Sequence, residues 1–172
     1  KALLAEAGVS GLELSIRTLN TSERILSATI IQANLAAIGI KANIIPLDSG
    51  PFWDMGQEKK GETWKDMELW IMRYGSGADP YEPMQWFVGS QVGVWNWERW
   101  SDKEFDALYA EGIISGDNSR RNEIYLRMQE IMENTGCYVW LTHEAEVYVH
   151  RDTLEVDLAP SGETLMPYFK PA

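Results

Sequence analysis

Several features that commonly point to a function are scarce in this sequence. Cys137 is the only cysteine, so no internal disulfide can form and cysteine usage does not reveal the compartment. A buried structural thiol is expected there, because no obvious His–Asp partner lies nearby in the sequence. No apolar run approaches the roughly 20 residues that a helix needs to cross a bilayer. No initiator Met or hydrophobic leader is visible either, and we interpret the sequence as a piece of a longer protein.

Basic residues and histidines are also few. The chain has 15 Lys and Arg against 26 Asp and Glu, a net charge of −11, so we expect no nucleic-acid partner and no direct membrane insertion. His143, Glu144, Glu146 and His150 do not have the H-E-x-x-H spacing. In a strand, His143 and His150 would point to opposite faces. The sequence therefore predicts no metal site, and we find no pattern typical of a cofactor.

Aromatic residues, in contrast, are abundant. Eight tryptophans occur among 172 residues, with 45% hydrophobic and 24% charged residues overall. This composition predicts a packed globular core, in one sizeable domain or two small ones. Tryptophan makes large, rigid contacts, so some of the eight are candidates for ligand contact, although most are expected in the core.

Alternating and helical periodicities follow one another along the chain. Leu12 to Ile16 alternate as in a strand, 25–38 carry a broad apolar helical face, and Lys41 to Leu47 form a second strand. This order predicts a βαβ unit, which 67–72 extend as a third strand. Further elements are expected downstream, beginning with a short helix over 80–88. A second helix should start at a Ser101–Glu104 capping box and break between Gly112 and Gly116, and a third should be capped by Asp117 or Ser119 and end at Gly136. Strands are expected over 138–141 and 146–149. The predicted fold class is α/β, with a mixed sheet flanked by helices.

The stretch from Met67 to Phe87, MELWIMRYGSGADPYEPMQWF, organises the rest. An apolar strand leads into a glycine turn, and Pro80 then opens an aromatic helix. Ligands of α/β proteins commonly bind where backbone N–H groups and side chains converge at such a strand end. Asp79 stands at this point, with Arg73 before the turn and Trp86 after it.

Several stretches, in order, resemble one family over nearly the whole chain. They are KALLAEAG with LELSIRT, IQANLAAIGIKANIIPLD, LWIMRYGSGADPYEP, NWERWSDKEFDALY and RRNEIYLRMQEIM leading into VWLTHEAEVYVHR. Together they resemble the C-terminal part of the bacterial extracellular solute-binding proteins of the oligopeptide/dipeptide/nickel class, the receptors of ABC importers. The loop from Gly61 to Asp66 departs from the family by a small insertion, and the N-terminal lobe of the family has no counterpart here.

The resemblance implies a two-lobed, type II periplasmic-binding-protein-like receptor that closes on its ligand without chemistry. Residues 1–138 would be the ligand-binding C-terminal lobe, and residues 139–172 the segment that returns toward the other lobe. The implied partners are a peptide or similar small polar solute and the membrane subunits of an ABC importer, and the implied location is the periplasm. No enzyme activity and no cofactor are implied.

The resemblance also suggests site residues on the glycine turn. Asp79 matches the position that holds the α-ammonium group of a peptide, and independently a carboxylate at such a turn suits a cation. The same residue could simply cap the following helix. Arg73 matches a position that contacts a ligand carboxylate, or it is a solvated charge at a strand end. The turn itself, with a possible backbone contact, comprises Tyr74, Ser76 and Gly77.

A second group of candidates lies further along the chain. Asn96 and Trp97 match the segment that lines the cleft, where an indole can form a wall and orient a polar group. Trp100 is interpreted as core. Two other functions remain open at this point: a carbohydrate-binding module that stacks sugars on Trp95, Trp97 and Trp100, and a hydrolase that uses the carboxylates of Asp79 and Glu82.

Overall fold

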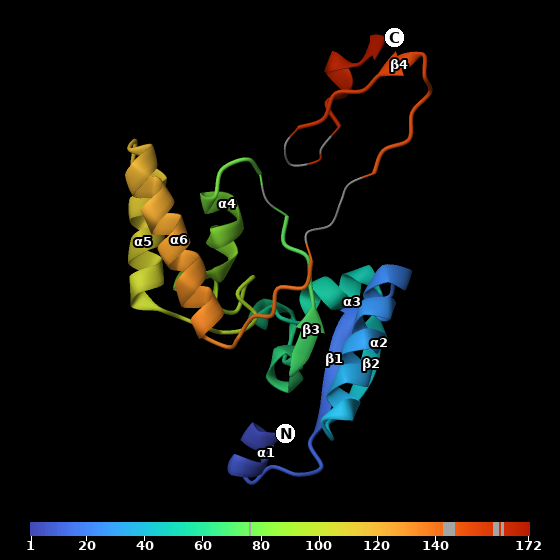
Figure 1. The fold of residues 1–172 in the computed structure, drawn as a ribbon, viewed down its shortest axis with the longest axis vertical. Coiled ribbons are helices and arrows are strands. Elements are labelled where there is room, and N and C mark those ends of the chain that lie inside the picture. The colour runs from blue at the N-terminus through green and yellow to red at the C-terminus, as the bar shows by residue number, and fades with distance from the viewer. Residues whose placement is uncertain (76, 143–146, 160–161, 163) are drawn as a thin grey trace. The chain divides into compact units, whose positions relative to one another are not determined.

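The computed structural model describes residues 1–172 except 76, 143–146, 160–161 and 163 (Figure 1). The described chain separates into two units, one made of 1–73 and 91–99 and the other of 74–90 and 100–172. The boundary expected near residue 139, between a lobe and a returning segment, stays a prediction.

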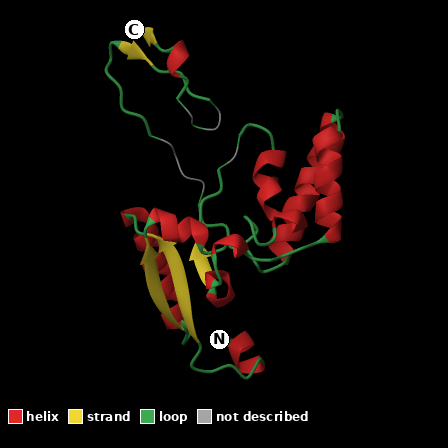
Figure 2. Ribbon diagram, turned by 180° about the vertical axis from the view of Figure 1, so that it is seen from behind, coloured by secondary structure: helices red, strands yellow, loops and turns green. Residues whose placement is uncertain are grey.

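The first unit is built on the predicted βαβ arrangement. Strand β1 (Glu13–Leu19) pairs in parallel with β2 (Lys41–Leu47) and with β3 (Leu69–Ile71), so the order is β2-β1-β3. Helix α2 (Ser22–Ala37) connects β1 to β2 and lies across one face of both strands (Figure 2). The α/β prediction is confirmed: this sheet is parallel, and antiparallel pairing occurs in a separate two-stranded ribbon.

Two apolar clusters stabilise the first unit. Beneath α2, the cluster consists of Ile16, Ala28, Ala42 and Ile71, with alternate strand residues facing the helix. The second cluster surrounds α3 (Ser49–Asp54), where Phe52, Met55 and Trp97 are buried. The remaining elements are short: α1 (Ala2–Glu6) and the 3-10 turns Glu58–Lys60 and Thr63–Asp66, the last of which lies in the loop where an insertion relative to the family is expected.

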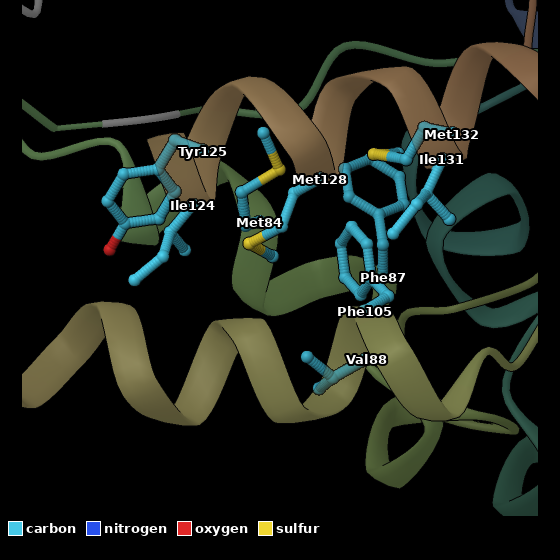
Figure 3. Packing of buried hydrophobic residues seen from close by; sticks show 9 residues of the cluster. All are labelled: Met84, Phe87, Val88, Phe105, Ile124, Tyr125, Met128, Ile131 and Met132. Atoms are coloured by element: carbon cyan, nitrogen blue, oxygen red, sulfur yellow. The ribbon is translucent and has the colours of Figure 1, made fainter. Parts of the chain in front are cut away.

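The second unit has a helical core. Helix α4 (Tyr81–Met84) runs into a 3-10 turn (Gln85–Phe87), and the longer helices α5 (Lys103–Ile114) and α6 (Asn118–Asn134) pack together. Their apolar faces meet in one cluster, drawn in Figure 3: Met84, Phe87, Val88, Phe105, Ile124, Tyr125, Met128, Ile131 and Met132. Small pieces complete the unit: a 3-10 turn at Gly89–Gln91 that reaches the boundary, the antiparallel strands β4 (Leu154–Glu155) and β5 (Lys170–Pro171), and a 3-10 turn at Met166–Tyr168.

The start of α5 differs from the prediction. Asp102, not Ser101, caps the helix by accepting a hydrogen bond from the Phe105 N–H at 2.8 Å. Glu104 does not complete a capping box, because both of its oxygens bind Arg127 of α6 at 2.7 and 3.0 Å. The cap of α6, at Asp117, agrees with one of the two predicted residues.

Helix α5 ends at Ile114, between Gly112 and Gly116 as predicted. Three other expectations are wrong. Residues 138–141 form no strand, since no described segment pairs with them; Tyr138 and Trp140 instead stack at 5.8 Å. Residues 147–149 are also irregular, and Glu146 lies outside the described residues. Cys137 is exposed, so its thiol is not a core group. Across the described ranges, no helix is both long enough and apolar enough to span a membrane.

Candidate functional site

The glycine turn that follows β3 is anchored by aromatic side chains of the next element. The Tyr74 ring meets Phe87 edge-on, with ring centroids 4.8 Å apart. The indole N–H of Trp86 donates to the carbonyl of Gly75 at 3.3 Å. Both contacts lie within the second unit, so the first half of the turn is fastened to the region just after α4. Ser76, a predicted site residue in this turn, lies outside the described residues.

Asp79 stands one residue ahead of Pro80, the N-cap residue of α4, and still bonds the start of the helix. Its Oδ1 accepts a hydrogen bond from the Tyr81 N–H at 3.1 Å, and its carbonyl accepts one from the Glu82 N–H at 3.0 Å. This is an Asx-type turn ahead of α4. The Asp79 side chain nevertheless stays 42% exposed, so its carboxylate is not enclosed by the unit.

Arg121 of α6 holds the same carboxylate, a contact that the sequence reasoning missed. Its Nη2 donates to both Asp79 oxygens, at 2.6 Å to Oδ1 and 2.7 Å to Oδ2. Its Nη1 donates to the Gly112 carbonyl at 2.6 Å. The one local hint was electrostatic: a helix N-terminus disfavours cations, yet Arg120 and Arg121 stand in the opening turns of α6. Such a placement indicates that other elements supply anionic partners.

The Arg121 half of this ion pair has aromatic surroundings and is largely closed. The Arg121 side chain is 18% exposed, and its guanidinium carbon lies 5.3 Å from the ring centroid of Tyr125. Burial raises the pKa of the Tyr125 phenol; the Arg121 charge opposes this shift and the Asp79 charge adds to it. Burial likewise raises the pKa of Tyr109. Both phenols therefore stay protonated at neutral pH and add no charge beside the ion pair.

The Asp79 carboxylate has capacity for a further donor. Among the described contacts, Oδ1 accepts two hydrogen bonds and Oδ2 accepts one. A carboxylate oxygen carries two lone pairs, so Oδ2 can accept another hydrogen bond. Gly77 lies close by: a Cβ built on it would come 1.9 Å from a carboxylate oxygen of Glu82. The turn therefore presents two carboxylates, one fixed by an arginine and one packed on a glycine.

The other predicted site residues belong to the first unit. Arg73 is exposed just after β3. Asn96 is 0% exposed, and Trp97 is 4% exposed with its indole N–H donating to the Val94 carbonyl at 3.0 Å. The structure therefore places Asn96 and Trp97 side by side in the interior of that unit, and Tyr74, Gly77 and Asp79 together in the other.

The tryptophans do not form the platform that a carbohydrate module needs. Trp95 and Trp97 are stacked, with centroids 6.4 Å apart, but the burial of Trp97 leaves no face for a sugar. Trp100 belongs to the other unit and packs edge-on against Phe105 at 5.0 Å, in agreement with its core interpretation. Burial thus argues against the stacking hypothesis.

The hydrolase alternative gains no geometric support, and the histidine-containing stretch, for which no metal site was predicted, is only partly described. His143, Glu144 and Glu146 lie outside the described residues, while the His150 ring contacts the Arg151 carbonyl. Within the described ranges, no group of three or more His, Cys, Asp or Glu is placed to hold a metal ion. Asp79, the candidate base, has both oxygens engaged by a guanidinium.

Known proteins resemble this chain over part of their length. No protein-family model matches it. Di/tripeptide-binding protein 2 of Pseudomonas aeruginosa is 32% identical over 150 residues, which make up 83% of this chain and 27% of that protein. The structure of clavulanic acid biosynthesis oligopeptide binding protein 2 shares the fold, with a TM-score of 0.86 at 23% identity over 99% of this chain and 32% of the other.

A third match links the fold to transport. The ABC transporter-associated periplasmic binding protein DppA of Helicobacter pylori, solved with the peptide STSA, gives a TM-score of 0.66. It is 25% identical, and the match covers 80% of this chain and 27% of that protein. The chain spans only 27% to 30% of the length of the first curated relatives that it matches.

Proposed function

Because the chain is homologous to part of the bacterial peptide-binding receptors, as its sequence resemblance indicated, we propose that it binds a short peptide through the Asp79 carboxylate. The observation that supports this proposal is the state of that carboxylate. It is held at the glycine turn by Tyr81 and Arg121, yet it stays 42% exposed with room at Oδ2. A fixed and accessible anion of this kind suits the α-ammonium group of a peptide.

The remaining predicted residues take supporting roles in this proposal. Arg73, exposed at the end of the strand, would meet the carboxylate of the ligand. Ser76 and Gly77 would offer backbone groups of the turn. Asn96 and Trp97 are buried in the first unit, and their place beside the ligand stays a prediction.

The proposal extends to the whole receptor. The chain would supply most of one lobe, a second lobe would close over the peptide, and closure would exclude water from the ion pair without any reaction. The full protein would work in the periplasm and deliver its peptide to the membrane subunits of an ABC importer. The relatives are named as binding proteins rather than enzymes, which agrees with a role in binding alone.

Calorimetry on the full-length protein tests the role of Asp79, with trialanine and N-acetyl-trialanine as probes. We expect trialanine to bind, and acetylation to weaken binding, since it removes the ammonium charge. Asp79→Ala should weaken trialanine binding by about 2–5 kcal/mol, roughly 30- to several-thousand-fold, because a desolvated ammonium loses its counter-ion.

Glu123→Gln is the matched control. Glu123 is an exposed carboxylate of α6 that pairs with Arg120 rather than Arg121, so its loss changes the net charge equally. Its affinity should stay near that of the unmodified protein. Unchanged trialanine affinity in Asp79→Ala would rule out the proposed contact.

A further inference from the structure

We propose that Arg121 is the positioning residue of the peptide site: it orients the Asp79 carboxylate for the ligand without touching the ligand itself. This inference rests on the proposed function of Asp79. It starts from one observation, that a single guanidinium joins the glycine turn to two helices far away in the sequence. The two charged partners are separated by 42 residues.

The contacts of Arg121 tie three elements of the second unit together. The side chain starts on α6, reaches the Gly112 carbonyl in the last turn of α5, and ends on Asp79. The last carbonyls of a helix have no intrahelical partner, so the Gly112 carbonyl gains a donor that its own helix cannot supply. Gly112 also makes room for Tyr125, since a Cβ there would lie 2.9 Å from the phenol oxygen.

Only arginine suits this position. The planar guanidinium offers several donors in a fixed arrangement, so it can bind a carbonyl and a carboxylate at once. At 18% exposure, beside the Tyr125 ring, it has little freedom to take another orientation. Its two bonds to Asp79, with the Tyr81 N–H on Oδ1, leave the unused hydrogen-bonding capacity on Oδ2. Arg121 therefore determines which part of the carboxylate faces a ligand.

Charge and position make opposite demands on this arginine. As a cation next to Asp79, Arg121 offsets the attraction between that carboxylate and an ammonium group. If charge alone mattered, its removal would strengthen binding of a cationic ligand. If it positions the carboxylate, its removal would weaken binding, because Asp79 would then sample orientations that do not match the ligand. The direction of the change separates the two roles.

The chain provides a close control for Arg121. Arg120 precedes it on α6, carries the same charge and also bridges to α5, through Glu111 at 2.7 and 3.0 Å. Arg120 contacts Glu123 as well and is more exposed, at 43%. Replacing either arginine therefore removes one positive charge and one bridge between α5 and α6, whereas replacing Arg121 also removes the contact with Asp79.

The test compares Arg121→Met, Arg121→Lys and Arg120→Met in the full-length protein, by calorimetry with trialanine well below each unfolding temperature. We expect Arg121→Met to bind trialanine at least about tenfold more weakly. Arg121→Lys should recover part of that loss, because lysine restores the charge without the planar guanidinium. Arg120→Met should stay within about twofold of the unmodified protein.

A double-mutant cycle identifies the route of the effect. In an Asp79→Ala background, adding Arg121→Met should change trialanine affinity by less than about twofold, since a residue that acts through Asp79 has nothing left to position. Unchanged or stronger binding in Arg121→Met, or the same loss with and without Asp79, would overturn the inference.

Amide hydrogen exchange distinguishes this inference from the proposed function. The Tyr81 N–H, which donates to Asp79, should exchange at least about tenfold faster in Arg121→Met than in Arg120→Met. The proposed function would fail if trialanine did not bind the unmodified protein, or if it bound Asp79→Ala with unchanged affinity. The Tyr81 exchange rate would still decide whether Arg121 positions the carboxylate, and equal rates in the two variants would refute it.

Discussion

At Gly56, the absence of a side chain decides how the core of the first unit packs. A Cβ built there would lie 2.2 Å from Cγ of Trp97, so the indole rests directly on the backbone. The same indole meets Phe52 edge-on at 5.7 Å and stacks on Trp95. A single hydrogen atom in place of a methyl group therefore sets the position of one predicted site residue.

Gly56→Ala is expected to destabilise the protein by about 1–3 kcal/mol, because the buried ring cannot move away from an added methyl group without strain. Gly50→Ala is the control: no atom lies within 4 Å of its added Cβ, and the residue is in α3. That change should be neutral or stabilising by less than about 1 kcal/mol. Urea unfolding followed by tryptophan fluorescence measures both, and equal midpoints would contradict the packing argument.

At the scale of elements, two arginines of α6 each bind a glutamate of α5 and so join the two helices. Arg127 binds Glu104 and Arg120 binds Glu111, each with two hydrogen bonds. Hydrogen bonds from these arginines lower the pKa of both glutamates below the ordinary value of 4.5. The helix pair thus combines the apolar faces shown in Figure 3 with ionic contacts at the surface.

These arginine–glutamate pairs predict how the stability of the folded protein depends on pH. A carboxyl group whose pKa is lowered in the folded state stabilises the fold above its ordinary pKa, 4.5 here, and loses that contribution as the pH falls through the lower folded value. The urea midpoint should therefore fall on acidification below pH 4.5, and fall less in Arg127→Gln. Lys103→Gln, an equal change of charge on α5, should behave like the unmodified protein. Parallel acid profiles for both variants would refute this account.

At the scale of the whole molecule, the chain covers a minor part of its relatives' length and exposes apolar side chains late in the sequence. Val139, Trp140, Val147 and Val149 are 80%, 57%, 81% and 95% exposed. Exposed apolar groups gathered in one stretch commonly mark a surface that another part of a protein covers. This agrees with the expectation that residues 139–172 return toward a second lobe, which stays a prediction.

The 172-residue chain on its own should bind trialanine weakly or not at all, because a single lobe cannot exclude water from the ion pair. Calorimetry with the chain and with the full-length protein gives the comparison. Binding of trialanine by the isolated chain with a Kd of about 1 μM or tighter, near −8 kcal/mol, would show that closure is not needed.

Local patterns predicted much of the fold. The alternation around Leu14 and Ile16 and the helical face over 25–38 led to the βαβ unit, because both periods come from backbone geometry. Helix starts were less certain: Ser101 and Asp102 both suit a cap, and only packing decided for Asp102. The strand expected over 138–141 failed because an apolar run does not reveal whether a pairing partner exists.

The sequence by itself determined the glycine turn and the carboxylate at its end, which depend on neighbouring residues, and the kinship with peptide receptors, which depends on stretches that keep their order along the chain. Only the tertiary structure decided what surrounds that carboxylate. Arg121 reaches Asp79 across 42 residues, and Trp97 is interior because Gly56 admits it. Such contacts arise when separate elements pack, and no periodicity of a few residues encodes them.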